Sequence, residues 1–118
     1  MVVAHRVWVQ IPGVVLNFET IVSSRISFYK NPDVNKKVNK LVLNGESLEL
    51  ISIKIDGLTA SYELKDDGLF LLSPPDNFNL DVQVRIHPES KTDLNGLYQS
   101  SGNFCTQCEA MGFRQITY

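Results

Sequence analysis

The sequence has little of several features that would each define a class of protein. It holds 2 cysteines in 118 residues, too few for the disulfide framework of a small secreted domain, so a cytoplasmic location is the simpler expectation. No segment approaches the run of about 18 apolar residues that a membrane-spanning helix needs, so we expect no membrane partner. The apolar stretch from Val7 to Leu16 is interrupted by Gln10, Pro12 and Gly13, so we expect no secretory signal either.

An excess of charge of one sign is also missing. Lysines and arginines total 11 against 13 aspartates and glutamates, which gives a net charge of -2. A nucleic-acid partner would call for a clustered basic surface with interleaved aromatic side chains, and neither is present. A chain with 43% hydrophobic and 20% charged residues is typical of a single globular domain.

What the sequence does contain is alternation with a period of two. Five apolar residues separated by polar ones predict a strand with one buried face: Phe78, Leu80, Val82, Val84 and Ile86. A similar but weaker alternation predicts another strand from Thr20 to Phe28. These two segments are the firmest basis for the fold class.

Shorter strands are expected between and around turn signals. In the segment from Leu48 to Ile55 the apolar face changes parity at Leu50 and Ile51, which predicts a β-bulge there. Asn44-Gly45 predicts a turn. Three other short strands are expected, at residues 41–43, 62–64 and 69–72. The chain from Leu97 onward has no clear period, and no segment shows helical periodicity with caps. The sequence therefore predicts an all-β fold, an antiparallel β-sandwich or curved sheet.

Reactive side chains are few and scattered. Cys105 and Cys108 form a C-x-x-C pair, but a structural zinc site needs four ligands, and His5 and His87 lack the ligand spacing. A redox role for the pair would need a helix start near a βαβ unit. Two ordinary thiols are the favoured interpretation, and His87, on the polar face of its strand, is expected to be a surface histidine. We therefore predict no catalytic residue and no metal ligand.

Gln107 and Glu109 are the candidate binding residues. In an extended segment they point the same way, two positions apart. An amide and a carboxylate together can hold a cationic ammonium group through charge-assisted hydrogen bonds. A surface glutamate with no specific role is the competing interpretation.

Two blocks of sequence resemble a known family. Residues 95–118 are similar to the pattern G-L-Y-x-S-x-x-x-x-C-T-Q-C-E-A-x-G-F-R-x-I-T-Y of the aminopeptidase N enzymes. Residues 41–53 resemble the family segment L-x-L-D-G-E-x-L-x-L-x-S-V. The resemblance covers residues 14–118, whereas residues 1–13 match nothing in the family. Three positions depart from what is usual in the family: Asn44 replaces the common Asp, Met111 stands where an acidic residue is usual, and Gln115 stands where a basic residue is usual.

The resemblance implies a saddle-like N-terminal β domain that packs against a thermolysin-like catalytic domain of the same enzyme. The glutamate that matches Glu109 helps to anchor the free α-amino group of a peptide substrate, and the glutamine that matches Gln107 lines the same pocket. An incomplete domain with an open sheet edge is expected, since the family's next strands complete the sheet.

The family's zinc-binding H-E-x-x-H motif and its G-x-M-E-N motif are absent from these 118 residues. We therefore expect no cofactor in this chain, with zinc bound elsewhere in the full-length enzyme, and no peptidase activity from this chain alone. The alternative interpretation is a stand-alone β-sandwich interaction module without catalysis.

Overall fold

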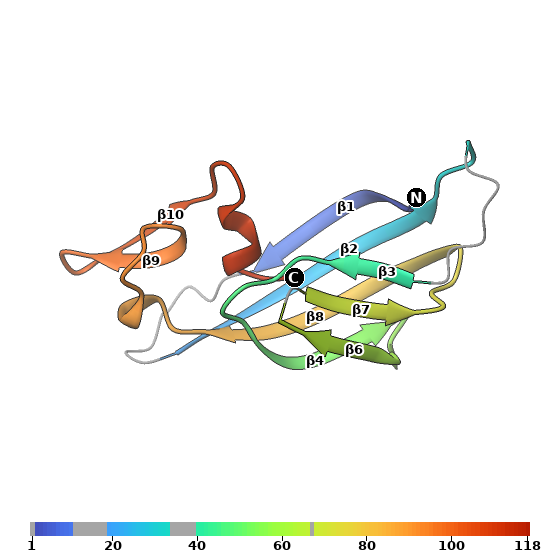
Figure 1. Ribbon diagram of the computed structural model, residues 1–118, viewed down its shortest axis with the longest axis horizontal. Coiled ribbons are helices and arrows are strands. Elements are labelled where there is room, and N and C mark those ends of the chain that lie inside the picture. The colour runs from blue at the N-terminus through green and yellow to red at the C-terminus, as the bar shows by residue number, and fades with distance from the viewer. Residues whose placement is uncertain (1, 11–18, 34–39, 67) are drawn as a thin grey trace.

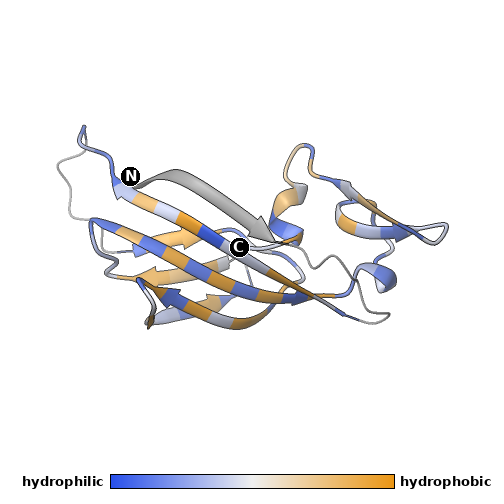
Figure 2. Ribbon diagram, turned by 180° about the vertical axis from the view of Figure 1, so that it is seen from behind, coloured by the Kyte–Doolittle hydropathy of each residue, from blue (hydrophilic) through white to orange (hydrophobic). Residues whose placement is uncertain are grey.

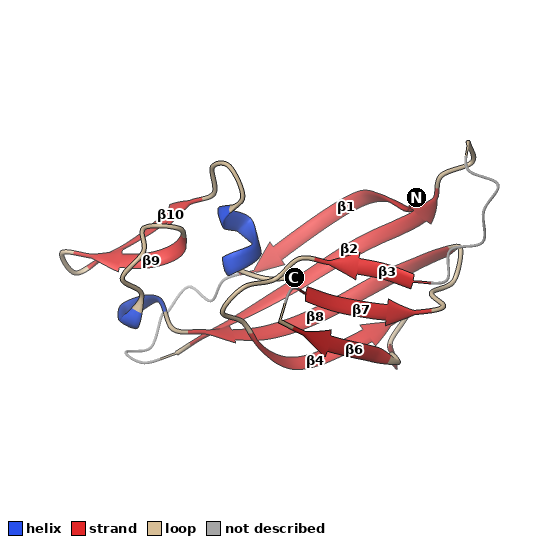
Figure 3. Cartoon of the chain, viewed as in Figure 1, coloured by secondary structure: helices blue, strands red, loops and turns tan. Residues whose placement is uncertain are grey.

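The computed structural model describes residues 2–10, 19–33, 40–66 and 68–118, with backbone only for residues 2–10. Strands dominate these residues, as the sequence predicts (Figures 1 and 3). They are β1 Val2–Gln10, β2 Thr20–Lys30, β3 Lys40–Leu43, β4 Glu49–Ile55, β5 Leu58–Thr59, β6 Tyr62–Lys65, β7 Gly68–Leu72, β8 Asn77–Ile86, β9 Gly96–Ser100 and β10 Asn103–Gln107. Two short 3-10 helices, η1 Pro88–Ser90 and η2 Gly112–Gln115, complete the elements.

The strands form three antiparallel sheets. A five-stranded sheet has the order β1-β2-β8-β4-β5, and a three-stranded sheet has the order β3-β7-β6. β9 and β10 form a separate two-stranded sheet at one end of the molecule (Figure 1). The predicted all-β, antiparallel class is confirmed. No helix among the described residues is long and apolar enough to cross a membrane.

The core lies between the two larger sheets. Every second residue of β8, from Phe78 to Ile86, is buried, and the alternating colours along this strand are visible in Figure 2. The same parity is buried in β2 from Thr20 to Phe28, and the rings of Phe28 and Phe78 stack with centroids 5.1 Å apart. From the opposite sheet, Leu69 and Leu71 of β7 are fully buried. Both predicted strands are therefore confirmed, with the predicted faces inward.

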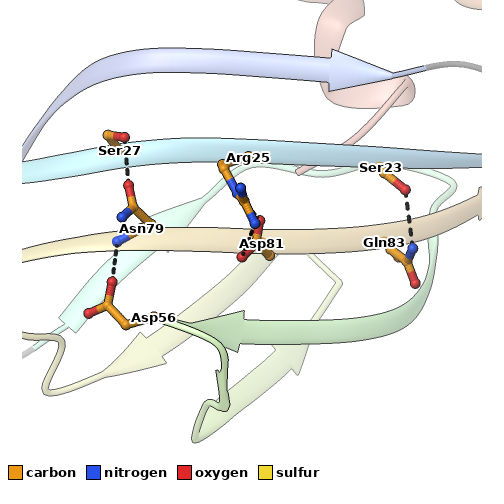
Figure 4. Close-up of polar contacts among 7 residues, drawn as sticks. All are labelled: Ser23, Arg25, Ser27, Asp56, Asn79, Asp81 and Gln83. Carbon is orange, nitrogen blue, oxygen red and sulfur yellow. Dashed lines mark hydrogen bonds and ion pairs between the residues drawn. The ribbon is translucent and has the colours of Figure 1, made fainter.

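The outer face of the five-stranded sheet is polar, with side chains paired across the strands (Figure 4). Arg25 Nε donates to Asp81 Oδ1 at 2.6 Å. Ser27 Oγ donates to Asn79 Oδ1 at 2.7 Å, and Gln83 Nε2 donates to Ser23 Oγ at 3.2 Å. Because these cross-strand pairs satisfy one another, this face needs no covering layer.

The connection between β3 and β4 refines one sequence prediction and confirms another. The register of β4 against β8 shifts between Leu50 and Ser52, which confirms the predicted bulge. The turn predicted at Asn44-Gly45 is displaced by two residues: the chain bends at Glu46 and Ser47, and Ser47 has the positive φ of 57°. This bend carries the chain from one sheet to the other, because β3 pairs with β7 and β4 pairs with β8.

The segment after Gly96, expected to be irregular, is a β-hairpin. β9 and β10 pair from Asn103↔Ser100 to Gln107↔Gly96, around a turn in which Ser101 and Gly102 have positive φ of 51° and 81°. Two successive residues with positive φ are what a tight two-residue hairpin turn requires. Most residues of this hairpin are at least partly exposed, so no apolar alternation marks it in the sequence.

Candidate functional site

The hairpin delivers the two candidate binding residues to an exposed turn. Gln107 ends β10, opposite Gly96, and Glu109 follows two residues later. The backbone N–H of Glu109 donates to Gln107 Oε1 at 3.2 Å, so the two residues are in direct contact. Both are exposed. The prediction that the two side chains point the same way assumed an extended segment. The strand ends at Gln107, however, and residues 109–111 form a turn.

Gly112 allows this turn to close against the hairpin. Its N–H donates to the carbonyl oxygen of Cys108 at 3.2 Å. A Cβ atom at this position would overlap the carbonyl oxygen of Gln107 and would lie 3.2 Å from the nitrogen of Gly96. Because only glycine lacks that atom, residue 112 fixes how closely the turn returns to the end of β10.

Arg114, which follows the exposed turn, is directed toward the bend between β3 and β4. Its Nη2 lies 2.9 Å from Oε2 of Glu46, in the bend between β3 and β4. The backbone adds a second link, because the N–H of Glu46 donates to the carbonyl oxygen of Arg114 at 3.0 Å. The structure therefore assigns Arg114 to holding the turn against the sandwich.

The three residues after Gln115 enter the core. Ile116, Thr117 and Tyr118 are 3%, 1% and 9% exposed. Thr117 Oγ1 donates to Ser24 Oγ at 3.3 Å in a buried hydrogen bond. Burial raises the pKa of the Tyr118 phenol, because the charged form would lose its hydration. The turn that carries Glu109 is thus followed directly by a segment packed into the sandwich.

The other reactive side chains do not join this site. Cys105 and Cys108 are both free thiols, one partly buried and one exposed. His87 is exposed and lines a hollow of about 550 Å³ together with Arg85 and Tyr118, on the sandwich and not on the hairpin. The side chain of His5 lies outside the described residues.

Within the part of the chain that the structure describes, no three His, Cys, Asp or Glu side chains come together as metal ligands. These residues do not fit a catalytic metal site, which needs three protein ligands in most zinc enzymes. No reaction step through a metal is therefore assigned to them.

Three apolar side chains in and near the exposed turn are themselves exposed. Phe104 on β10 is 38% exposed, Met111 is 65% exposed and Phe113 is 42% exposed. No periodicity in the sequence marks these three residues as exposed.

Comparison with known proteins places the chain among peptidases. Aminopeptidase N of Caulobacter vibrioides is 46% identical over 102 residues, which cover 84% of this chain and 12% of that protein. Aminopeptidase N of Escherichia coli is 44% identical over 79 residues, covering 66% and 9%. The crystal structure of Legionella pneumophila aminopeptidase A in complex with aspartic acid matches with a TM-score of 0.87 at 26% identity, covering 99% of this chain and 14% of that one. No family model matches the chain.

The fold is shared more widely. An M1 zinc metallopeptidase from Deinococcus radiodurans, bound to a Tyr-Ser-Ala substrate, matches with a TM-score of 0.65 at 12% identity, over 86% of this chain and 24% of that one. The chain is homologous to one part of aminopeptidase N, which confirms the resemblance. It spans about 9–12% of the length of the relatives that it matches.

Proposed function

We propose that this chain forms part of the N-terminal β domain of a zinc-dependent aminopeptidase, where it provides scaffold and helps to recognise the free N-terminus of a peptide. The observation that supports this most is the placement of Glu109. Glu109 stands on an exposed turn, where its backbone N–H donates to Gln107 Oε1, in a chain 46% identical to an aminopeptidase N over 102 residues.

The chemistry of the pair suits the proposed ligand. A peptide's α-amino group has a pKa of roughly 7.7–8.0, so most of it is charged at neutral pH. The Glu109 carboxylate can accept charge-assisted hydrogen bonds from that ammonium group. Gln107 Oε1 already accepts from the N–H of Glu109, and a carbonyl oxygen has a second lone pair. Such a site favours free N-termini over internal peptide bonds, which is the selectivity of an exopeptidase.

The proposed partner of the surrounding surface is the catalytic domain of the same enzyme. Phe104, Met111 and Phe113 expose apolar area beside the candidate pair, and covering that area with a second domain would remove it from water. Zinc belongs to that other domain in this proposal. We propose a cytoplasmic location for the enzyme, consistent with two free thiols.

Activity measurements test the proposal in two settings. The purified chain is expected to hydrolyse an aminoacyl-arylamide no faster than the buffer background, with or without added zinc. Clear hydrolysis that follows the protein through purification would contradict the proposal that the catalytic zinc site lies in another domain.

The second setting is a longer protein in which this segment is joined to the zinc site. There Glu109→Ala is expected to lower kcat/KM by roughly ten- to a hundredfold, since hydrogen bonds to charged groups are worth about 1.5–3 kcal/mol. Glu63→Ala is the matched control, because Glu63 is also an exposed glutamate and lies on β6, away from the hairpin. If the two variants have the same kcat/KM, the assignment of Glu109 is wrong.

A further inference from the structure

Two segments far apart in the sequence meet behind the candidate site. The bend between β3 and β4 contributes Gly45 and Glu46, and the segment after the exposed turn contributes Arg114 and Tyr118. Glu46 makes two links to Arg114, one through the backbone at 3.0 Å and one between side chains at 2.9 Å. We call these four residues the clasp. In Figure 1 the chain's C-terminus lies beside β3 and β7, in the sandwich.

Gly45 contributes to the clasp by its lack of a side chain. A Cβ atom at residue 45 would overlap the Tyr118 ring. The backbone of Gly45 does not have a positive φ, so close packing against the ring, and not backbone conformation, requires glycine here. Tyr118 is 9% exposed and belongs to the core cluster, so it cannot move away cheaply.

The segment after the exposed turn is held on two sides: Arg114 pairs with Glu46, and Gln115 Oε1 accepts a hydrogen bond from Lys91 Nζ. Residues 103–109 make few buried contacts, and the charged and apolar side chains there are largely in water. From Glu109 the chain reaches Arg114 in five residues, through Gly112, which packs on the carbonyl oxygen of Gln107. A displacement of Arg114 therefore moves the segment against which Gln107 and Glu109 are set.

We propose that Gly45 and Glu46 are positioning residues, which fix the turn that carries Gln107 and Glu109 by clasping Arg114 and Tyr118. Neither touches the candidate pair. The clasp couples the bend between the two main sheets to the exposed turn. Its consequence for peptide recognition rests on the proposed function, whereas the clasp itself does not.

Amide hydrogen exchange of this chain, followed residue by residue, tests the clasp. Three backbone N–H groups report on it, namely those of Glu46, Gly112 and Ile116, each of which donates a hydrogen bond. Glu46→Gln keeps the size of the side chain and removes its charge. We expect it to speed exchange at these amides by about two- to fivefold, the range that a partly exposed ion pair provides, with Val82 in β8 unchanged.

Glu49→Gln is the matched control. Glu49 is the first residue of β4, directly after the bend, and is similarly exposed. It pairs with Arg85 of β8 at 2.8 Å, so the three reporting amides should not respond. Exchanging the charges, with Glu46→Arg and Arg114→Glu together, should restore slow exchange. Gly45→Ala should speed exchange at the same amides by more than Glu46→Gln does.

Two outcomes would overturn the clasp. One is unchanged exchange at all three amides in Glu46→Gln. The other is an equal rise at Val82, which would mean loss of global stability and not release of the turn. Because neither peptide nor zinc takes part, these measurements can fail while Glu109 still recognises an N-terminus, and they can succeed if it does not.

Discussion

The sandwich and the hairpin end of this chain differ in how much of their side-chain surface is buried. In the sandwich, side chains such as Leu69, Leu80 and Val84 are 0% exposed, and the outer face of the larger sheet is closed by paired polar groups. In the β9–β10 hairpin, Leu97 is the one large side chain under 9% exposed. Three large apolar side chains, Phe104, Met111 and Phe113, remain in water at this end.

This difference means that the residues that stabilise the fold and the candidate binding residues lie in different parts of the chain. Buried apolar area provides most of the driving force for folding, and nearly all of it lies in the sandwich. The candidate pair stands where little is buried, so its geometry must be imposed from outside the hairpin. In this chain the imposed contacts come from the Glu46–Arg114 pair and the buried segment that ends at Tyr118.

The largest expected effect is on the sandwich side. Leu80→Ala removes a fully buried side chain from the middle of β8, and such truncations cost about 2–5 kcal/mol. Urea unfolding followed by circular dichroism measures the loss. Leu64→Ala is the control, because Leu64 on β6 is 50% exposed and should cost well under half as much. Equal losses would mean that the described core does not carry the stability.

A smaller effect is expected where the turn meets the hairpin. Gly112→Ala places a methyl group against the carbonyl oxygen of Gln107, and overpacking of this kind costs about 1–3 kcal/mol. The amide resonances of residues 107–115 should shift while those of β8 stay in place. The exposed Ser100→Ala, at the far end of the same hairpin, should leave both sets unchanged. Shifts spread evenly over the sandwich would show that the two regions are not separable.

The sequence predicts the sandwich better than the hairpin for a physical reason. A half-buried strand must alternate apolar and polar residues, so the pattern from Phe78 to Ile86 predicts both the strand and its buried face. In the same way, the change of parity at Leu50 predicts the bulge. Only Gly96 and Leu97 of β9 and β10 are buried, so burial selects no alternating pattern there. The pairing of β2 with β8 joins residues between 48 (Tyr29 and Asn77) and 66 (Thr20 and Ile86) positions apart, so it leaves no local trace in the sequence.

The candidate site divides in the same way. Gln107 and Glu109 are two residues apart, so their contact could be expected from spacing, although the turn after Gln107 could not. The ion pair between Glu46 and Arg114 joins the bend between β3 and β4 to η2. Two charged residues far apart in the sequence carry no mark of their pairing, so the clasp emerges only from the fold.

Tyr118 gives a pH-dependent effect that is confined to alkaline solution. Burial raises the pKa of its phenol above 10.0. As the pH rises, the unfolded chain therefore loses this proton before the folded chain does. The phenol's contribution to the free energy of unfolding is complete below about pH 10 and falls as the pH rises through the folded-state pKa. Urea midpoints between about pH 8 and 11.5 should show this fall, and Tyr118→Phe should reduce it. Tyr62→Phe, at a position 43% exposed, is the control and should leave the fall intact.

The smallest expected effect on stability is at the candidate residue itself. Glu109 is exposed, and its backbone N–H, not its carboxylate, donates the hydrogen bond to Gln107. Glu109→Ala should therefore change the free energy of unfolding by no more than about 0.5 kcal/mol, measured by the same urea titration as Leu80→Ala. A loss above about 1 kcal/mol would make Glu109 a structural residue. A near-zero change would mean that any effect of this substitution on kcat/KM in a longer enzyme reflects recognition and not unfolding, because the hairpin end then carries its chemistry without supporting the fold.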